Sequence, residues 1–309
     1  MKKASGATFG VVGEELHPTP ISGTAPLRFA DFLALTKPRL NSLVIFTAAI
    51  GYFLGARESL ALTSLVQTVA GIALVAGGAA GLNQIYERNT DSVMRRTRTR
   101  PLPAHRITPG EAAVFSIGLA AIGLVIVAAT SNRLAVLLTL LTLVSYNIVY
   151  TPLKRRSPQA TLVGAIPGAL PPMIGWVAGR GALTAEAWAL FAIVFVWQIP
   201  HFMAIAWLYR DDFGRAGFPL LSVVHPDGRS TARQAVLFSI LLVPVSLAPY
   251  LLGMTGPAYA VGAAAGSVGL LWLAISFARR RLDDRARLLF LGSITYLPLL
   301  WGMLIVDRL

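Results

Sequence analysis

The sequence predicts an all-α protein that crosses a membrane several times. Hydrophobic residues make up 55% of the 309 residues, charged residues only 13%, and the mean hydropathy is +0.65. A soluble domain of this size normally carries about a quarter charged residues. The charges also gather in short runs between long apolar stretches. Because an apolar stretch of about 20 residues spans a bilayer as a helix, we expect a polytopic helical bundle.

Nine apolar stretches are long enough to span a membrane. Several contain closely spaced Gly and Ala, as in residues 71–81, and small residues of this kind let helices pack closely in lipid. The nine predicted transmembrane helices lie near residues 40–56, 63–83, 111–130, 133–151, 159–179, 185–206, 234–253, 257–278 and 288–306.

The distribution of Lys and Arg predicts the orientation. With the N-terminus in the cytoplasm, all 27 Lys and Arg residues fall inside except Arg57, Arg133, Arg180 and Arg308. Cytoplasmic loops are enriched in these residues, so the net charge of +13 reflects topology and not nucleic-acid binding. The protein should lie in the cytoplasmic membrane with its C-terminus outside.

The ends of the chain and its lack of cysteine set further limits. Residues 1–26 are polar, lack the apolar core of a secretory signal and read as a disordered cytosolic tail, which leaves residues 27–309 as the membrane domain. The chain has no cysteine, which excludes disulfides, zinc–thiolate sites and thioether-linked haem.

The most informative segment is 83–103, which begins where the second predicted helix ends. Asn83, Glu87 and Asp91 recur every four residues and would line one side of a helix, and four arginines follow by residue 100. Carboxylate and amide oxygens suit Mg2+, and arginine binds phosphate in a bidentate way. This pattern predicts a magnesium–diphosphate site, although solvated loop charges that only set the topology would look similar.

A second acidic cluster strengthens the enzymatic interpretation. Asp211 and Asp212 directly follow the sixth predicted helix, so both clusters face the cytoplasm. Two acidic sites on one membrane face suit a diphosphate held through magnesium from both sides. Adjacent residues point about 100° apart on a helix, so one aspartate of the pair is the expected direct ligand.

Several motifs resemble the UbiA-type superfamily of intramembrane prenyltransferases, and in particular its haem-prenylating branch. The resemblance covers about residues 30–305. The motifs are LTKPRL at 35–40, NQIYERNTD at 83–91, RTRTRPLP at 96–103, YTPLKRRSPQ at 150–159, GALPPMIGW at 168–176, and WQIPHFMAIA at 197–206 running into YRDDFGRAGFPLL.

The resemblance implies a bundle around a central cavity and transfer of a farnesyl group from farnesyl diphosphate to a vinyl group of haem b. The product would be haem O, which a downstream haem-modifying enzyme could receive. The implied metal–diphosphate residues are Asn83, Glu87 and Asp91 in the first cluster and Asp211 and Asp212 in the second. Magnesium is the implied cofactor, with Asn83, Glu87, Asp91 and Asp211 as its ligands. Arg95, Arg98 and Lys154 are the implied diphosphate contacts.

One departure bears on the acceptor. Gln84 and Glu87 stand where quinone-type members of the superfamily usually carry aspartates. This difference favours haem over an aromatic ring acid, and it leaves the number of magnesium ions open. A transferase acting on a quinone precursor is the nearest alternative. A transporter is the alternative from another class, but transporters place ionisable residues near the membrane midplane.

The predicted haem contacts are His201 and Trp197. Imidazole suits iron, although His201, which follows Pro200, could instead be a hydrogen-bonded histidine that holds a helix break. The aromatic faces of Trp197, Tyr146 and Phe202 could stabilise a cationic intermediate, or they could be ordinary packing residues.

Overall fold

A computed structural model describes residues 27–56 and 61–309 of the chain. In these residues the backbone is helical, apart from turns and one isolated bridge between Thr255 and Arg308. The all-α prediction is therefore confirmed. The predicted disordered tail at 1–26 lies outside the described residues.

Eight helices in the described part of the chain are long and apolar enough to cross a membrane. They are α3 (Leu62–Val93), α4 (Pro109–Thr130), the continuous span Arg133–Leu153, α7 (Ala160–Arg180), α8 (Ala185–Leu208), α11 (Arg229–Leu251), α12 (Pro257–Arg280) and α13 (Asp283–Val306). The span Arg133–Leu153 consists of α5 (Arg133–Val144), the π-helix η1 (Ser145–Tyr150) and α6 (Thr151–Leu153).

The predicted first membrane helix corresponds to α2 (Pro38–Gly55). It has 18 residues, begins with the polar residues Arg39 and Asn41, and is not among the eight candidate spans. The predicted number of nine is therefore not confirmed. The remaining short helices are α1 (Leu27–Leu35), α9 (Arg210–Arg215) and α10 (Leu221–Val224).

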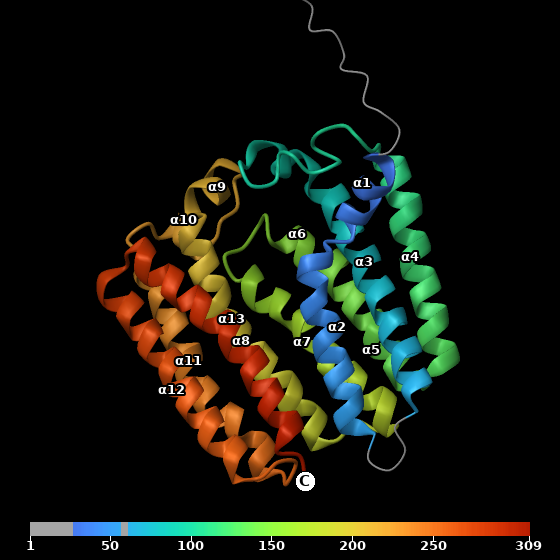
Figure 1. Ribbon diagram of the computed structural model, residues 1–309. Coiled ribbons are helices and arrows are strands. Elements are labelled where there is room, and N and C mark those ends of the chain that lie inside the picture. Colours follow the sequence, from blue (N-terminus) through green and yellow to red (C-terminus); the bar gives the residue numbers. More distant parts are fainter. Residues whose placement is uncertain (1–26, 57–60) are drawn as a thin grey trace, which may run out of the picture.

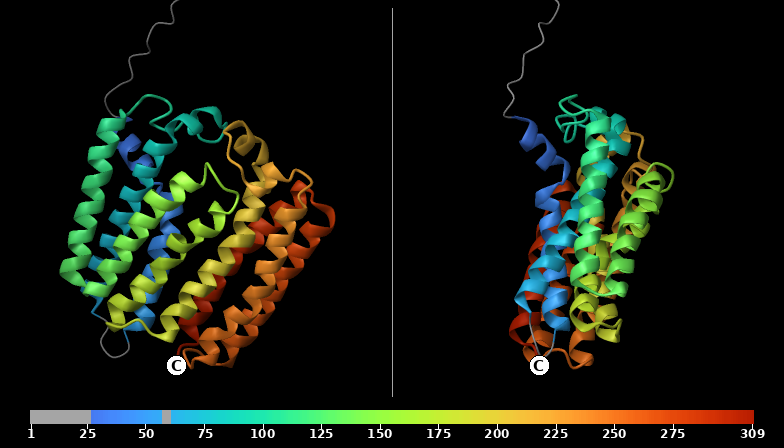
Figure 2. Two further views of the ribbon diagram at one scale, coloured as in Figure 1. Left: turned by 180° about the vertical axis from the view of Figure 1, so that it is seen from behind. Right: turned by 90° about the vertical axis from the view of Figure 1, so that its right-hand side faces the viewer.

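The long helices run side by side, and the longer connections gather at one end of the bundle (Figure 1). The loop after α3 and the segment that contains α9 and α10 lie together at this end in both views of Figure 2, and the C-terminus lies at the other. The loops that follow the two acidic clusters are thus on the same face, as the topology predicted.

Small residues allow the closest helix contacts. A Cβ atom on Gly51 of α2 would lie 2.0 Å from the carbonyl oxygen of Pro172, and one on Gly175 of α7 would lie 1.9 Å from that of Ala48. Gly78 makes a similar approach of α3 to Ser116 of α4, at 2.5 Å. Close backbone packing at small residues is typical of membrane helices. It confirms the interpretation of the 71–81 segment and brings α2 and α3 close to their neighbours.

Candidate active site

The three polar residues of the first cluster share one buried side of α3. The helix continues to Val93 and therefore includes all of them. Asn83, Glu87 and Asp91 are 2%, 3% and 1% exposed, whereas Tyr86 between them is 43% exposed. The spacing of four residues thus places the three side chains on one side of the helix, as predicted. They are buried and are not solvated loop charges.

Each member of this cluster meets a cationic side chain from a different part of the chain. Lys37 donates to Asn83 Oδ1 at 2.8 Å and Lys154 to Glu87 Oε1 at 3.0 Å. Arg100 donates to Asp91 Oδ2 at 2.7 Å. A buried carboxylate is costly unless a cation or a hydrogen bond compensates it. Three cations therefore surround two carboxylates and one neutral amide.

Lys37 is a site residue that our sequence analysis did not single out. It lies between α1 and α2, has a left-handed φ of 49°, and precedes Pro38 at the start of α2. Burial, and then the nearby Arg100, lower the pKa of Lys37 to about 8. Its partner Asn83 is neutral, so the positive charge of Lys37 has no direct counter-ion there. The LTKPRL motif was the available signal, but it does not reveal which way Lys37 points.

Thr151 determines how the Asn83 amide is oriented. Asn83 Nδ2 donates to Thr151 Oγ1 at 3.1 Å, and Thr151 Oγ1 donates in turn to the carbonyl oxygen of Tyr146 at 2.8 Å. Tyr146 lies in the π-helix η1, and π-helical turns are frequent at functional sites. With its NH2 group held by Thr151, Asn83 turns its oxygen toward Lys37.

Gln84 points away from this cluster. Its side chain is 1% exposed and donates from Nε2 to the carbonyl oxygen of Leu35, the last residue of α1, at 2.7 Å. A carboxylate has no hydrogen to donate to that carbonyl. Gln84, which stands where the quinone-type pattern has an acidic residue, therefore anchors α1 to α3.

The two aspartates of the second cluster have different environments. Asp212 is 8% exposed and pairs with Arg215 within α9. Asp211 is exposed and makes no ion pair or hydrogen bond with the described residues. The Asp211 carboxylate is thus free to take a cation, while that of Asp212 is already neutralised.

Cation–π contacts join segments that lie next to the two clusters. The Arg96 guanidinium lies 5.1 Å from the ring centre of Tyr209 and 5.7 Å from that of Phe213. Lys154, the partner of Glu87, lies 4.6 Å from the ring centre of Phe218. Burial lowers the pKa of Arg96 from its ordinary value, with a further contribution from Arg100. The tertiary structure therefore brings the second cluster beside the first.

Arg95 and Arg98, the predicted diphosphate contacts, are exposed. No ion pair or hydrogen bond links their side chains to the residues that the structure describes. The neighbouring Arg100 instead pairs with Asp91 of the first cluster, and Arg96 contacts Tyr209 and Phe213 on either side of the second. The predicted role of Arg95 and Arg98 stays a prediction.

His201 and Trp197 lie one turn apart on α8 and face α13. Trp197 is 3% exposed and donates from Nε1 to the carbonyl oxygen of Ser293 at 2.8 Å. His201 Nδ1 lies 2.8 Å from Ser293 Oγ, and its ring stacks on Trp197 with centres 5.1 Å apart. Trp197 is therefore a packing residue that supports His201, and a haem contact by either side chain stays a prediction.

Comparison with known proteins identifies the fold and the class of enzyme. Residues 44–294 match the UbiA prenyltransferase family. The chain belongs to this family. The protein is therefore a prenyltransferase, and the alternative interpretation as a transporter is excluded.

Its relatives include proteins named protoheme IX farnesyltransferase. That of Solibacter usitatus is 46% identical over 90% of this chain and 98% of its own length. That of Opitutus terrae is 44% identical over 94% of this chain and 98% of its own length. The resemblance to the haem-prenylating branch of the UbiA family is thus confirmed.

Solved structures of more distant proteins share the fold. A digeranylgeranylglyceryl phosphate synthase has a TM-score of 0.76 at 17% identity, covering 90% of this chain and 98% of that one. A UbiA homologue from Archaeoglobus fulgidus, bound to GPP and Mg2+, has a TM-score of 0.61 at 16% identity, covering 89% and 99%. At these identities the likeness establishes the UbiA fold alone.

The oxygen donors of the first cluster fit magnesium that arrives with a substrate. No group of three or more His, Cys, Asp or Glu side chains in residues 27–56 and 61–309 could hold a metal ion. Mg2+ commonly takes one or two carboxylates and completes its shell with water and phosphate oxygens. Asp91 Oδ1 is buried and has no hydrogen-bond partner among the residues that the structure describes. The available donors therefore suit a shared metal–diphosphate site better than a site made of protein alone.

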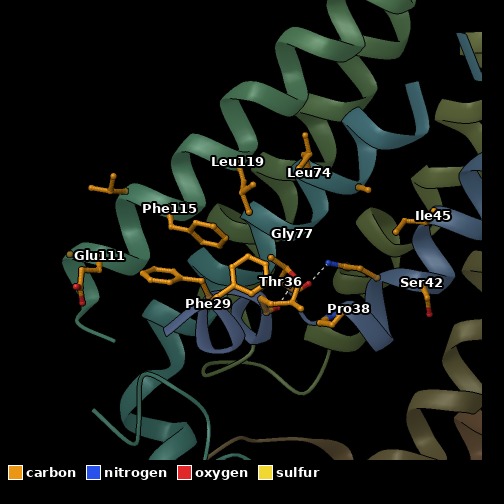
Figure 3. Close-up of a pocket in the computed structure, with 16 residues that line it drawn as sticks. Phe29, Thr36, Pro38, Ser42, Ile45, Leu74, Gly77, Glu111, Phe115 and Leu119 are labelled. Carbon is orange, nitrogen blue, oxygen red and sulfur yellow. Dashed lines mark hydrogen bonds between the residues drawn. The ribbon is translucent and has the colours of Figure 1, made fainter. Parts of the chain in front are cut away.

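An apolar pocket of about 920 Å³ lies elsewhere, between α1, α2, α3 and α4 (Figure 3). Aromatic side chains such as Phe29 and Phe115 line it, and it contains none of the predicted site residues. Its one ionisable lining residue, Glu111, pairs with Arg28 and caps the start of α4 with Thr108. This pocket therefore suits an apolar chain and not a diphosphate.

Proposed function

We propose that this member of the UbiA family transfers the farnesyl group of farnesyl diphosphate to a vinyl group of haem b, with addition of water, and so forms haem O. The observation that carries the proposal is the buried cluster at the loop end of the bundle. There Asn83, Glu87 and Asp91 lie among Lys37, Lys154 and Arg100. The arrangement can bind a polyanion together with a cation.

The charges of this cluster favour a diphosphate. Glu87 and Asp91 are neutralised by Lys154 and Arg100, while the one hydrogen bond of the Lys37 ammonium group to the described residues goes to a neutral amide. The cluster therefore has an excess positive charge that an anionic group can compensate. Since charged groups act strongly in a site that excludes water, Lys37 is the first diphosphate contact that we assign.

The protein oxygens assigned to magnesium are those of Asn83, Glu87, Asp91 and Asp211. Bound magnesium would neutralise charge on the diphosphate and so favour its departure. Lys154 and Arg100 would then turn from their carboxylates to the phosphate oxygens. Asp211 has no ion pair in the described structure, so it can serve from the second cluster without losing a partner. Arg95 and Arg98 would add outer contacts from the exposed loop.

The reaction needs no protein nucleophile. The C1–O bond of farnesyl diphosphate breaks and its electron pair leaves with the diphosphate, which Lys37 and Arg100 hold. The π electrons of the haem vinyl group form the new C–C bond to C1. Water adds to the resulting cation beside the porphyrin ring and releases a proton to solvent. Positioning and electrostatic stabilisation supply the rate enhancement.

The names of the relatives support haem as the acceptor. Gln84 gives a structural reason for the departure from the quinone-type pattern, since it holds α1 instead of a metal ion. We assign residues 27–309 as one catalytic domain with residues 1–26 as a cytosolic tail. The loop end is assigned to the cytoplasmic face of the cytoplasmic membrane, because it carries most of the Lys and Arg residues. A haem-modifying enzyme is the predicted recipient of the product.

The decisive experiment uses the purified protein with farnesyl diphosphate and Mg2+, and offers haem b and 4-hydroxybenzoate in separate reactions. Mass spectrometry should detect haem O from haem b and no prenylated product from 4-hydroxybenzoate. Product from 4-hydroxybenzoate but not from haem b would overturn the proposal in favour of a quinone precursor as acceptor.

A further inference from the structure

Ser293 fixes the hydrogen-bonding state of His201. Ser293 Oγ lies 2.6 Å from the carbonyl oxygen of Phe290 and donates to it. A serine hydroxyl has a single hydrogen to donate, so toward His201 Nδ1, at 2.8 Å, it can only accept. Nδ1 therefore carries the proton, and Nε2 of the neutral ring carries the free lone pair.

Packing holds the ring in place. The imidazole stacks on Trp197 and on Phe290 with ring centres 5.1 Å apart in both cases. Trp197 is itself tied to the Ser293 carbonyl oxygen. Because one residue of α13 binds both aromatic side chains of α8, the imidazole cannot turn over without breaking these contacts.

The lone pair on Nε2 has no partner in the described part of the chain. The hydrogen bonds there include one for Nδ1 and none for Nε2. His201 is half-buried, and Nε2 is not one of the fully buried polar atoms that lack a hydrogen-bond partner. The atom therefore reaches accessible space and can meet a ligand.

A histidine in this state is typical of a metal ligand, whose second nitrogen usually donates to a neighbouring oxygen. Residues 27–56 and 61–309 offer no group of three acids, histidines or cysteines that could complete a protein metal site. The metal that suits a single imidazole is one that brings its other ligands with it. Porphyrin-bound iron meets this requirement and commonly takes histidine as its axial ligand.

The position of His201 along α8 suits a haem acceptor of the prenyl group that lies beside the diphosphate site. Leu208, the end of α8, lies seven positions after His201, which corresponds to a rise of roughly 10 Å. Tyr209, which contacts Arg96, and the second acidic cluster follow directly. A haem held at His201 would thus lie on the membrane side of the diphosphate site, where the prenyl chain also has to lie.

We propose that His201 coordinates the iron of the haem acceptor through Nε2, and that Ser293 is the positioning residue that holds the imidazole in the required tautomer. The proposal rests on the proposed function, because it takes haem as the acceptor.

The test uses the full-length protein in detergent with haem b and no farnesyl diphosphate. Optical titration measures haem affinity, and resonance Raman spectroscopy of the ferrous complex detects the iron–histidine stretch. His201→Ala should remove this stretch and weaken haem binding at least tenfold, and added imidazole should restore nitrogen ligation. His225→Ala is the matched control, because His225 lies exposed in the loop before α11. It should behave as the wild type does.

Ser293 is tested separately. Ser293→Ala should keep the iron–histidine stretch but lower its frequency, because the Nδ1 proton loses its acceptor, and should weaken haem binding about tenfold. Ser293→Thr keeps a hydroxyl and should restore both values. A Ser293→Ala protein identical to the wild type in frequency and affinity would overturn the positioning role.

The experiments distinguish a wrong assignment of His201 as the iron ligand from a wrong proposed function. If the wild-type protein farnesylates haem but His201→Ala leaves its spectrum unchanged, the ligation is wrong and the function stands. If the iron–histidine stretch is present and lost in His201→Ala but no haem O forms, the function is wrong and the ligation stands.

Discussion

Lys37 donates a hydrogen bond to Asn83 across 2.8 Å, although 46 positions separate them in the sequence. The contact joins the junction of α1 and α2 to the buried side of α3. It places an ammonium group beside an amide and two carboxylates that are already paired with other cations. The electrostatic character of the site depends on this relationship.

The pH dependence of the enzyme should therefore report Lys37. Lysine is positive below its pKa, and burial has lowered the pKa of Lys37 to about 8. As the pH rises through this value the charge is lost, so kcat/KM for farnesyl diphosphate should fall above about pH 8. Lys37→Arg keeps its charge at all working pH values and should move the fall to higher pH. An unchanged descending limb in this variant would assign it to another group.

Thr151 should control activity through the orientation of Asn83. Thr151→Val removes the hydroxyl that accepts from Asn83 and donates to the Tyr146 carbonyl. We expect kcat/KM to fall roughly tenfold, equivalent to about 1.4 kcal/mol, a typical cost for such a lost hydrogen bond. Thr151→Ser keeps the hydroxyl and should retain most of the activity in the same steady-state assay. Equal activity of Thr151→Val and the wild type would contradict the role of Thr151.

Loss of either carboxylate that we propose as a magnesium ligand should abolish turnover while leaving membrane insertion intact. Asp91→Ala and Asp211→Ala should each lower kcat by a factor on the order of 100 or more, because they remove charge from the site where the leaving group departs. Asp284→Ala is the matched control, since this exposed aspartate at the start of α13 pairs with Arg285, away from both acidic clusters. Chelation of Mg2+ should also stop haem O formation, and its re-addition should restore it. Near-normal turnover of both site variants with Mg2+ would refute the two-cluster model.

The close approach of α2 and α7 should make Gly175 important for stability. A Cβ at this position would lie 1.9 Å from the Ala48 carbonyl oxygen, so Gly175→Ala has to push the two helices apart. Overpacking of this kind costs about 1–3 kcal/mol and should lower the thermal midpoint of the detergent-solubilised protein. Gly118→Ala is the control, because a Cβ on Gly118 of α4 meets no atom within 4 Å. Its midpoint should equal or exceed that of the wild type, and equal losses in both variants would rule out the packing explanation.

Some parts of the site could be predicted from periodicity, and others could not. Asn83, Glu87 and Asp91 lie on one helix, where spacing alone determines that they share a side. Lys37, Thr151 and Ser293 act across helices that are far apart in the sequence, so no local pattern marks them. The arginines after α3 lie in a turn and not in a regular helix. The side chains that each of these arginines contacts could not be predicted for the same reason.

The amino-acid sequence by itself determined the helical membrane architecture, the face that carries both acidic clusters and the family of enzyme. These properties follow from apolar length, from the distribution of Lys and Arg, and from motifs that are each local in the chain. Only the tertiary structure decided which cation meets which carboxylate, that Asp212 is paired while Asp211 has no ion pair within the described part of the chain, and that Ser293 sets the tautomer of His201. These properties depend on how helices pack against one another, and packing selects individual side-chain partners that hydrophobicity and spacing cannot specify.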